Sequence, residues 1–223
     1  FVPSSVGGAE RVVRESLFFM PTSTDALRRD RSRGAGVPGP WQMFFSGFLK
    51  HPVMVGSIIP SSDRLIAKML RPVDWSRCKL FVEYGPGVGT FCRPILEKMA
   101  PDATLIAIDT NPDFIRYLDH TITDSRFVAV HGSAADVTQI VKDHGHEAAD
   151  YVLSGLPFST LPPGVGPAIA SATQAVLRPG GAFLVYQFSP KVRDFIAPHF
   201  ERIDHDMEWW NVPPAQLYWG WKD

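Results

Sequence analysis

Cysteine is scarce in this sequence, which holds only Cys78 and Cys92 among its 223 residues. Two cysteines cannot build a disulfide framework, and their spacing is not that of a metal site. The sequence therefore predicts no metal centre. It also predicts that both cysteines are buried or half-buried thiols in a reducing compartment.

Long hydrophobic runs are also missing. No apolar stretch approaches the roughly 20 residues that a membrane-spanning helix needs. The pattern of a secretory signal is not seen either, in a sequence that begins at Phe1. We therefore expect a cytoplasmic protein, and the sequence leaves open a peripheral association with a membrane.

An excess of charge of one sign is absent. The chain has 22 Lys and Arg against 23 Asp and Glu, a formal net charge of -1. This balance excludes a protein that binds nucleic acid by overall charge. Residues 1–50 nevertheless hold seven basic and four acidic residues, a local net charge of +3. This segment is a candidate for contacting an anionic membrane surface, although a solvated basic helix face fits the composition equally well.

From residue 79 onward, short apolar runs alternate with segments of helical periodicity. Such an alternation is typical of a βαβ series, which forms a parallel sheet with helices on both faces. We expect strands at 80–83, 104–108, 127–130, 151–153 and 182–188, and helices at 91–100, 112–120, 135–144 and 167–177. Two further strands, at 200–210 and 216–221, would close the chain as an antiparallel hairpin. The predicted fold is α/β and Rossmann-like, with a mostly parallel seven-stranded sheet.

The chain ahead of this series is predicted to be a helical extension, residues 1–55, followed by the main domain, residues 56–223. The aromatic stripe of residues 41–49 has helical spacing. It fits a helix packed on the core, or an amphipathic helix at a membrane interface. Downstream, Ser61, Ser62 or Asp63 would cap a helix that runs to Leu70.

A glycine-rich turn follows the first strand of the series, in residues 79–91. Glycines let the backbone approach a ligand closely, and the following helix start offers free N–H groups. Glu83 stands at the strand end, where a carboxylate would repel a pyrophosphate but suit an ammonium group. The turn therefore favours S-adenosylmethionine (SAM) over a dinucleotide.

Two more acids follow the next strands. Asp109 ends the second strand and could accept hydrogen bonds from both ribose hydroxyls, while Asp136 follows the third and could accept one from the adenine amino group. Singly, these acids could instead serve as helix caps, and Glu83 as a partner of a helix dipole. A dehydrogenase is the rival hypothesis, but the spacing of Gly85, Gly87 and Gly89 is G-x-G-x-G and not G-x-G-x-x-G.

Residues 83–91 resemble the first motif of the class I SAM-dependent methyltransferases, and the resemblance covers roughly residues 56–223. It implies methyl transfer, with SAM as cofactor and the reversed last strand of that family. The expected cofactor-binding residues are Glu83, Tyr84, Gly85, Pro86, Gly87, Gly89, Asp109, Thr110, Asn111, Ser133, Ala134, Ala135 and Asp136. Ile59, Ser61 and Ser62 are expected to close over SAM.

The end of the fourth strand supplies the expected acceptor site, Ser154, Gly155, Leu156, Pro157 and Phe158. Oxygens at 154–156 could accept hydrogen bonds from an amine, and the Phe158 ring could pack on a base or a cationic head group. The alternative is a rigid turn after a strand.

This segment is similar to the Asn-Leu-Pro-Phe motif of the ribosomal RNA adenine dimethyltransferases. It is more similar, together with residues 48–52, 55–62, 132–136 and 212–215, to the bacterial phospholipid N-methyltransferases. That resemblance implies methylation of an amine-bearing phospholipid such as phosphatidylethanolamine. A ribosomal RNA adenine, a soluble amine or a non-catalytic SAM-binding module remain alternatives.

Overall fold

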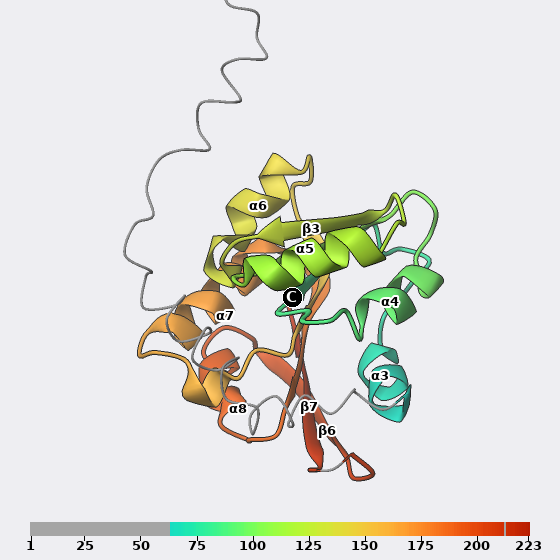
Figure 1. Ribbon diagram of the computed structural model, residues 1–223. Helices are drawn as coiled ribbons and strands as arrows, with labels where there is room; N and C mark the ends of the chain where they lie inside the picture. The colour runs from blue at the N-terminus through green and yellow to red at the C-terminus, as the bar shows by residue number, and fades with distance from the viewer. Residues whose placement is uncertain (1–62, 212) are drawn as a thin grey trace, which may run out of the picture. The chain divides into compact units, whose positions relative to one another are not determined.

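The computed structural model describes residues 63–211 and 213–223, which form one seven-stranded mixed sheet with helices on both faces (Figure 1). The strands are β1 (Leu80–Tyr84), β2 (Thr104–Asp109), β3 (Phe127–His131), β4 (Ala149–Ser154), β5 (Leu177–Gln187), β6 (Arg202–Glu208) and β7 (Ala215–Trp221). The helices are α3 (Asp63–Leu70), α4 (Cys92–Lys98), α5 (Pro112–Thr121), α6 (Val137–Asp143), α7 (Val165–Val176) and α8 (Val192–Ile196), with the 3-10 turns η2 (Ala134–Asp136) and η3 (Phe158–Thr160).

The strand order is β3-β2-β1-β4-β5-β7-β6. Strands β1 to β5 run parallel, while β7 runs antiparallel to both β5 and β6. Every residue of β1 and β4 is buried, because helices cover both faces of these central strands. The predicted α/β fold with its terminal antiparallel hairpin is thus confirmed.

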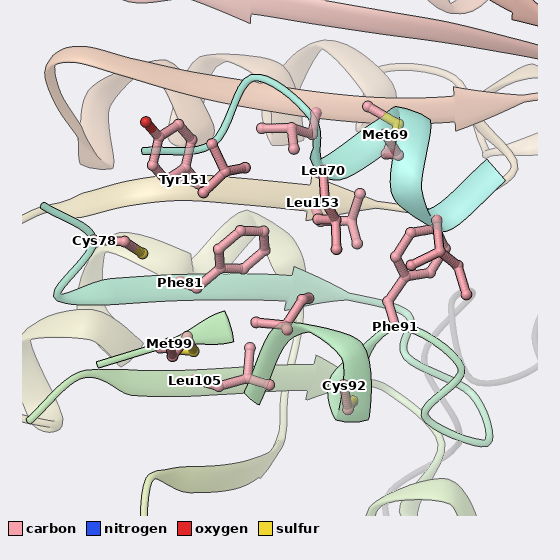
Figure 2. Close-up of a cluster of buried hydrophobic side chains, with 14 of the residues drawn as sticks. Met69, Leu70, Cys78, Phe81, Phe91, Cys92, Met99, Leu105, Tyr151 and Leu153 are labelled. Carbon is pink, nitrogen blue, oxygen red and sulfur yellow. The ribbon is translucent and has the colours of Figure 1, made fainter. Parts of the chain in front are cut away.

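Two apolar clusters hold the helices to the sheet. On one face, α3, α4 and Leu118 of α5 pack against side chains such as Phe81, Leu105 and Leu153 (Figure 2). On the other face, α6, α7 and α8 pack against the alternate side chains of the same strands, among them Val82 and Phe183. Alternation along each strand therefore decides which face a site residue belongs to.

Two strands begin before the positions expected from the sequence. Strand β4 begins at Ala149 instead of residue 151, and β5 begins at Leu177 instead of residue 182. A buried acid causes this extension: Asp150 accepts hydrogen bonds from the N–H groups of Lys79 and Leu80 and pairs with Arg178. The short helix α8 was not predicted at all.

The carboxyl ends of the parallel strands form the functional edge of the sheet. Here the glycine turn connects β1 to α4, and the chain leaves β2, β3 and β4. The antiparallel hairpin returns to the same edge, because Gln187 at the end of β5 pairs with Gln216 near the start of β7. The turn between β6 and β7 therefore lies at the same edge of the sheet as these strand ends.

The predicted N-terminal extension, residues 1–55, lies outside the described residues, as do the start of the main domain at residue 56 and the aromatic segment 41–49. No helix within the described ranges is long and apolar enough to cross a membrane.

Candidate cofactor and acceptor site

A cleft opens at the carboxyl edge of the sheet, over the ends of β1, β2 and β3. The empty space within it is about 320 Å³, a figure that includes the open solvent at its mouth. It is lined by Gly85, Ile108, Asp109, Thr110, Gly132, Ser133, Ala134, Leu156 and Ile169. Five of the predicted cofactor residues and one predicted acceptor residue thus meet in one place.

The glycine turn forms one wall of this cleft. Gly85, Gly87 and Gly89 all have positive φ angles, of 63°, 56° and 81°. A side chain at Gly85 would collide with Leu156, since an added Cβ would lie 2.8 Å from its Cδ2 atom. A Cβ at Gly87 would meet nothing within 4 Å, so the backbone there faces open space that a ligand can approach.

Asp109 lies at the base of the cleft, with 8% of its surface exposed. Burial raises the pKa of its carboxyl group, and nearby backbone N–H groups of Asn111 and Gly87 act against that shift. The Asn111 N–H lies 2.8 Å from Oδ1. Asn111 itself caps α5, by accepting a hydrogen bond from the N–H of Asp113, so Asp109 is not the cap.

Thr110, next in the lining, supplies an unsatisfied polar group. Its Oγ1 is the only buried side-chain nitrogen or oxygen without a hydrogen-bond partner in the described ranges. A buried hydroxyl of this kind costs free energy unless a ligand or water satisfies it. The unsatisfied Thr110 hydroxyl and the open space next to the Gly87 backbone both suit a polar ligand.

The third strand contributes Ser133 and Ala134 to the cleft, whereas Asp136 does not line it. The Ser133 hydroxyl accepts a hydrogen bond from the N–H of Ala135, which orders the start of η2. Asp136 is exposed, and its side chain makes no capping hydrogen bond at α6. Its predicted contact with adenine therefore stays a prediction.

Glu83 also lies outside the cleft lining, on the face of β1 that α4 covers. Its carboxyl is 3% exposed, and the Cys92 thiol donates a hydrogen bond to Oε2 at 3.1 Å. Burial raises the pKa of Glu83 to about 7, against the effect of that hydrogen bond, and the nearby Asp109 raises it further. Tyr84 points to the opposite face, where its hydroxyl lies 3.1 Å from the Thr173 hydroxyl.

The loop after β4 holds the predicted acceptor residues. The Ser154 hydroxyl is fully buried and accepts a hydrogen bond from the Leu156 N–H, and the Leu156 carbonyl accepts one from Gln187. The Phe158 ring is 1% exposed and packs against Phe183 and Phe195, so its observed contacts are with the core and not with a ligand space.

Tyr186 of β5 lies against the predicted acceptor loop, a contact that the sequence did not reveal. An added Cβ at Gly155 would lie 2.6 Å from the Tyr186 Cζ atom and would overlap its hydroxyl. The ring also stacks on Phe91, with centroids 5.0 Å apart. Tyr186 therefore occupies the space that a side chain at position 155 would fill.

Ile108, Ile169 and Gln187 were also missed. In the sequence the two isoleucines cannot be told apart from the apolar core residues around them. Gln187 carried a usable signal, since it is a buried polar residue at a strand end. Ile59, Ser61 and Ser62, which were predicted to cover SAM, lie outside the described residues.

Across residues 63–211 and 213–223, His, Cys, Asp and Glu side chains form no group of three or more that could hold a metal ion.

Comparisons with known proteins agree with this geometry. The family described as "Methyltransferase domain" matches residues 81–181. An ornithine lipid N-methyltransferase of Singulisphaera acidiphila is 32% identical over 178 residues, which cover 79% of this chain and 93% of that protein. The ribosomal RNA small subunit methyltransferase H of Shewanella pealeana matches only 66 residues, 30% of this chain and 21% of that protein, at 35% identity.

Among solved structures, the 1,6-didemethyltoxoflavin-N1-methyltransferase of Burkholderia thailandensis, with bound S-adenosylhomocysteine, has the same fold. Its TM-score is 0.61 at 15% identity, over 85% of this chain and 92% of that one. SAM is the cofactor of this fold family, and the buried Asp109 carboxylate, the Thr110 hydroxyl and the open backbone at Gly87 suit its polar adenosine part. This chain belongs to the class I SAM-dependent methyltransferases.

Proposed function

We propose that this enzyme transfers methyl groups from SAM to the amine of a lipid head group, such as that of phosphatidylethanolamine. The observation that carries the proposal is the similarity to the ornithine lipid N-methyltransferase, which extends over 93% of that protein. Ornithine lipids and phosphatidylethanolamine share the relevant chemistry, an alkyl amine on a polar head group that is anchored by acyl chains.

The cofactor would be held by groups at the ends of three strands. SAM supplies a methyl group already activated on a sulfonium centre. Asp109 would accept hydrogen bonds from the ribose hydroxyls, and Thr110, Ser133 and Ala134 would surround the adenosine part. Glu83 would face the ammonium group of the methionine part. These residues bind and orient the cofactor, which leaves alignment of the acceptor as the remaining task.

The acceptor amine would be aligned at Gly155 and Tyr186. The tyrosine hydroxyl has two acceptor lone pairs and lies where the side chain of residue 155 would be. It would accept a hydrogen bond from the amine, and its ring face would attract the cationic head group once methylated. Stacking on Phe91 fixes the ring, so the amine is presented to the cleft in one orientation. An amine attacks only through its lone pair, so it must be neutral when the methyl group moves.

The proposal predicts methylated lipid products. The full chain, incubated with labelled SAM and vesicles of phosphatidylethanolamine or of ornithine lipid, should label the lipid fraction. Separation of the lipids then shows which head group is used and how many methyl groups are added. Phosphatidylcholine vesicles serve as the control, since their head group has no free amine.

Two results would overturn this function. One is the absence of labelled lipid from both vesicle types in a preparation that binds SAM. The other is preferential labelling of ribosomal RNA or of a small soluble amine, which would assign the same fold to another acceptor.

Asp109→Ala is predicted to weaken SAM binding about 10- to 100-fold, because a charge-assisted hydrogen bond contributes roughly 1.5–3 kcal/mol. Isothermal calorimetry with SAM measures the change. Asp113→Ala is the matched control, since Asp113 lies four residues away on α5, is exposed and pairs with Arg116. Equal SAM affinities of Asp109→Ala and the wild type would refute the ribose contact.

A further inference from the structure

The turn between β6 and β7 carries two neighbouring exposed tryptophans. Trp209 is 68% exposed and Trp210 is 78% exposed, the highest values among the large hydrophobic side chains of the described residues. Indole rings exposed to this degree are costly in water, and tryptophan is enriched where one end of a side chain meets apolar material and the other meets water. The exposed indole rings therefore indicate that this turn contacts an apolar partner.

Two hydrogen bonds within the turn and contacts from helix α3 hold the described residues of the turn. The buried Glu208 carboxylate accepts a hydrogen bond from the Trp210 N–H at 3.0 Å, and the Asn211 side chain donates one to the Pro213 carbonyl. Helix α3 braces it from the side, with Lys68 bonded to the Met207 carbonyl and the Arg64 guanidinium 5.8 Å from the Trp210 ring centroid. The two indoles thus project from a turn that is hydrogen-bonded internally and to helix α3.

The position of the turn identifies its partner. Gln187 pairs with Gln216 and Glu208 pairs with Ala215, which places the turn at the same carboxyl edge of the sheet as the loop after β4, with β5 between β4 and β7. Phe188, 42% exposed, follows directly on the end of β5 at this edge. A lipid acceptor keeps its acyl chains in the bilayer, so the enzyme must bring this edge of the sheet to the bilayer surface.

We propose that Trp209 and Trp210 dock the enzyme on the lipid bilayer, with the exposed Phe188 at the same edge of the sheet, so that this edge faces the head groups. This inference rests on the proposed lipid substrate. The charged side chains of α3 and the end of β6 offset one another: Lys68 and Arg71 pair with Asp206 and Glu208, and Arg64, which lies on the Trp210 ring, follows Asp63 in the chain. Binding through this surface therefore depends on insertion of the aromatic rings and little on salt.

The experiment measures binding of the full chain to phosphatidylcholine vesicles, which offer no amine, so binding is separated from catalysis. The double variant Trp209→Ser/Trp210→Ser should bind at least about tenfold more weakly than the wild type, at both roughly 0.1 M and 0.5 M salt. Tyr117→Ser is the matched control, because Tyr117 is a 49% exposed aromatic residue on α5. It should bind like the wild type.

Activity assays separate the docking surface from the active site. The double variant should keep wild-type SAM affinity, and wild-type methyl transfer to a short-chain amine lipid that is monomeric in water, yet lose most transfer to vesicles. Vesicle binding equal to that of the wild type would overturn the docking role, whether or not lipid is methylated. Trp-dependent vesicle binding without any lipid methylation would instead support docking and overturn the proposed substrate.

Discussion

Glu83→Gln should stabilise the ligand-free protein and at the same time weaken its binding of SAM. The two effects have opposite signs because one carboxyl group is costly without the cofactor and useful with it. Glu83 is 3% exposed, and within residues 63–211 and 213–223 its carboxyl group accepts only the weak hydrogen bond from the Cys92 thiol. No side chain of the described ranges forms an ion pair with it, so a ligand with an ammonium group would supply a positive partner for the buried carboxylate.

The stability effect follows from the pKa of Glu83, which burial raises from 4.5 to about 7. Below pH 4.5 the group is protonated in both the folded and the unfolded chain and has no net effect. Between pH 4.5 and 7 only the unfolded chain releases the proton, so folding is progressively disfavoured as pH rises. Above pH 7 the cost is constant, on the order of 3 kcal/mol. Glutamine removes it, so the gain in melting temperature should grow from pH 5 to pH 7.

The binding effect follows from the proposed contact with the ammonium group of SAM. Loss of one partner of a buried ion pair typically costs roughly 3–5 kcal/mol, so affinity should fall by about 100-fold or more. Wild-type affinity should increase between pH 6 and 7.5 as Glu83 ionises, whereas the variant should show a flat profile. The α-amino group of SAM remains mostly charged over this range, since such groups titrate near pH 8.

Glu208→Gln is the control for this experiment. Glu208 is also buried, at 6% exposure, but accepts a hydrogen bond from the Trp210 N–H and lies 4.0 Å from the Lys68 ammonium. Its replacement should lower the melting temperature and leave SAM binding unchanged. If Glu83→Gln stabilises the protein without any loss of SAM affinity, the carboxyl group is buried for another reason and the ammonium contact is wrong.

Most of the proposed cofactor half of the site could be predicted from the sequence, because its residues lie in short segments at the strand ends. Gly85 and Asp109 each lie at a strand end, and parallel strands bring their carboxyl ends to one edge. The position of such residues follows from the order of strands and helices alone. Asp136 shows the limit, since a residue only three positions beyond the lining residue Ser133 is exposed and outside the cleft.

The proposed acceptor half could not be predicted in the same way, because it depends on contacts between segments that are distant in the sequence. Tyr186 lies over Gly155 only because β4 and β5 are neighbours in register, with Ser154 opposite Val185. The Phe158 ring joins the core because Phe183 and Phe195 offer it partners there. Neither the position of Tyr186 nor that of Phe158 can be predicted from the neighbouring residues in the sequence. The same holds for the turn between β6 and β7 with Trp209 and Trp210, whose place at the carboxyl edge of the sheet follows from the pairing of β5 with β7.

Gly155→Ala should abolish most methyl transfer while leaving SAM binding nearly intact. The added methyl group would overlap the Tyr186 hydroxyl, so the ring or the loop must move. A displacement of about 1 Å at an aligned acceptor can cost on the order of 100-fold in rate. SAM affinity should change by less than about threefold, a limit below 0.7 kcal/mol, because Gly155 does not line the cofactor cleft. Single-turnover methyl transfer and calorimetry with SAM measure the two quantities.

Gly220→Ala tests whether crowding alone explains such a loss. A Cβ there would lie 2.8 Å from the Phe200 ring, a comparable collision on β7 near the opposite end of the strand from the acceptor edge. It should lower the melting temperature but leave methyl transfer per folded molecule unchanged. Tyr186→Phe keeps the ring and removes only the hydroxyl, so it should also slow transfer while SAM affinity stays the same. Near wild-type rates for both Gly155→Ala and Tyr186→Phe would show that the amine is aligned elsewhere, and the loop after β4 would then be a structural turn.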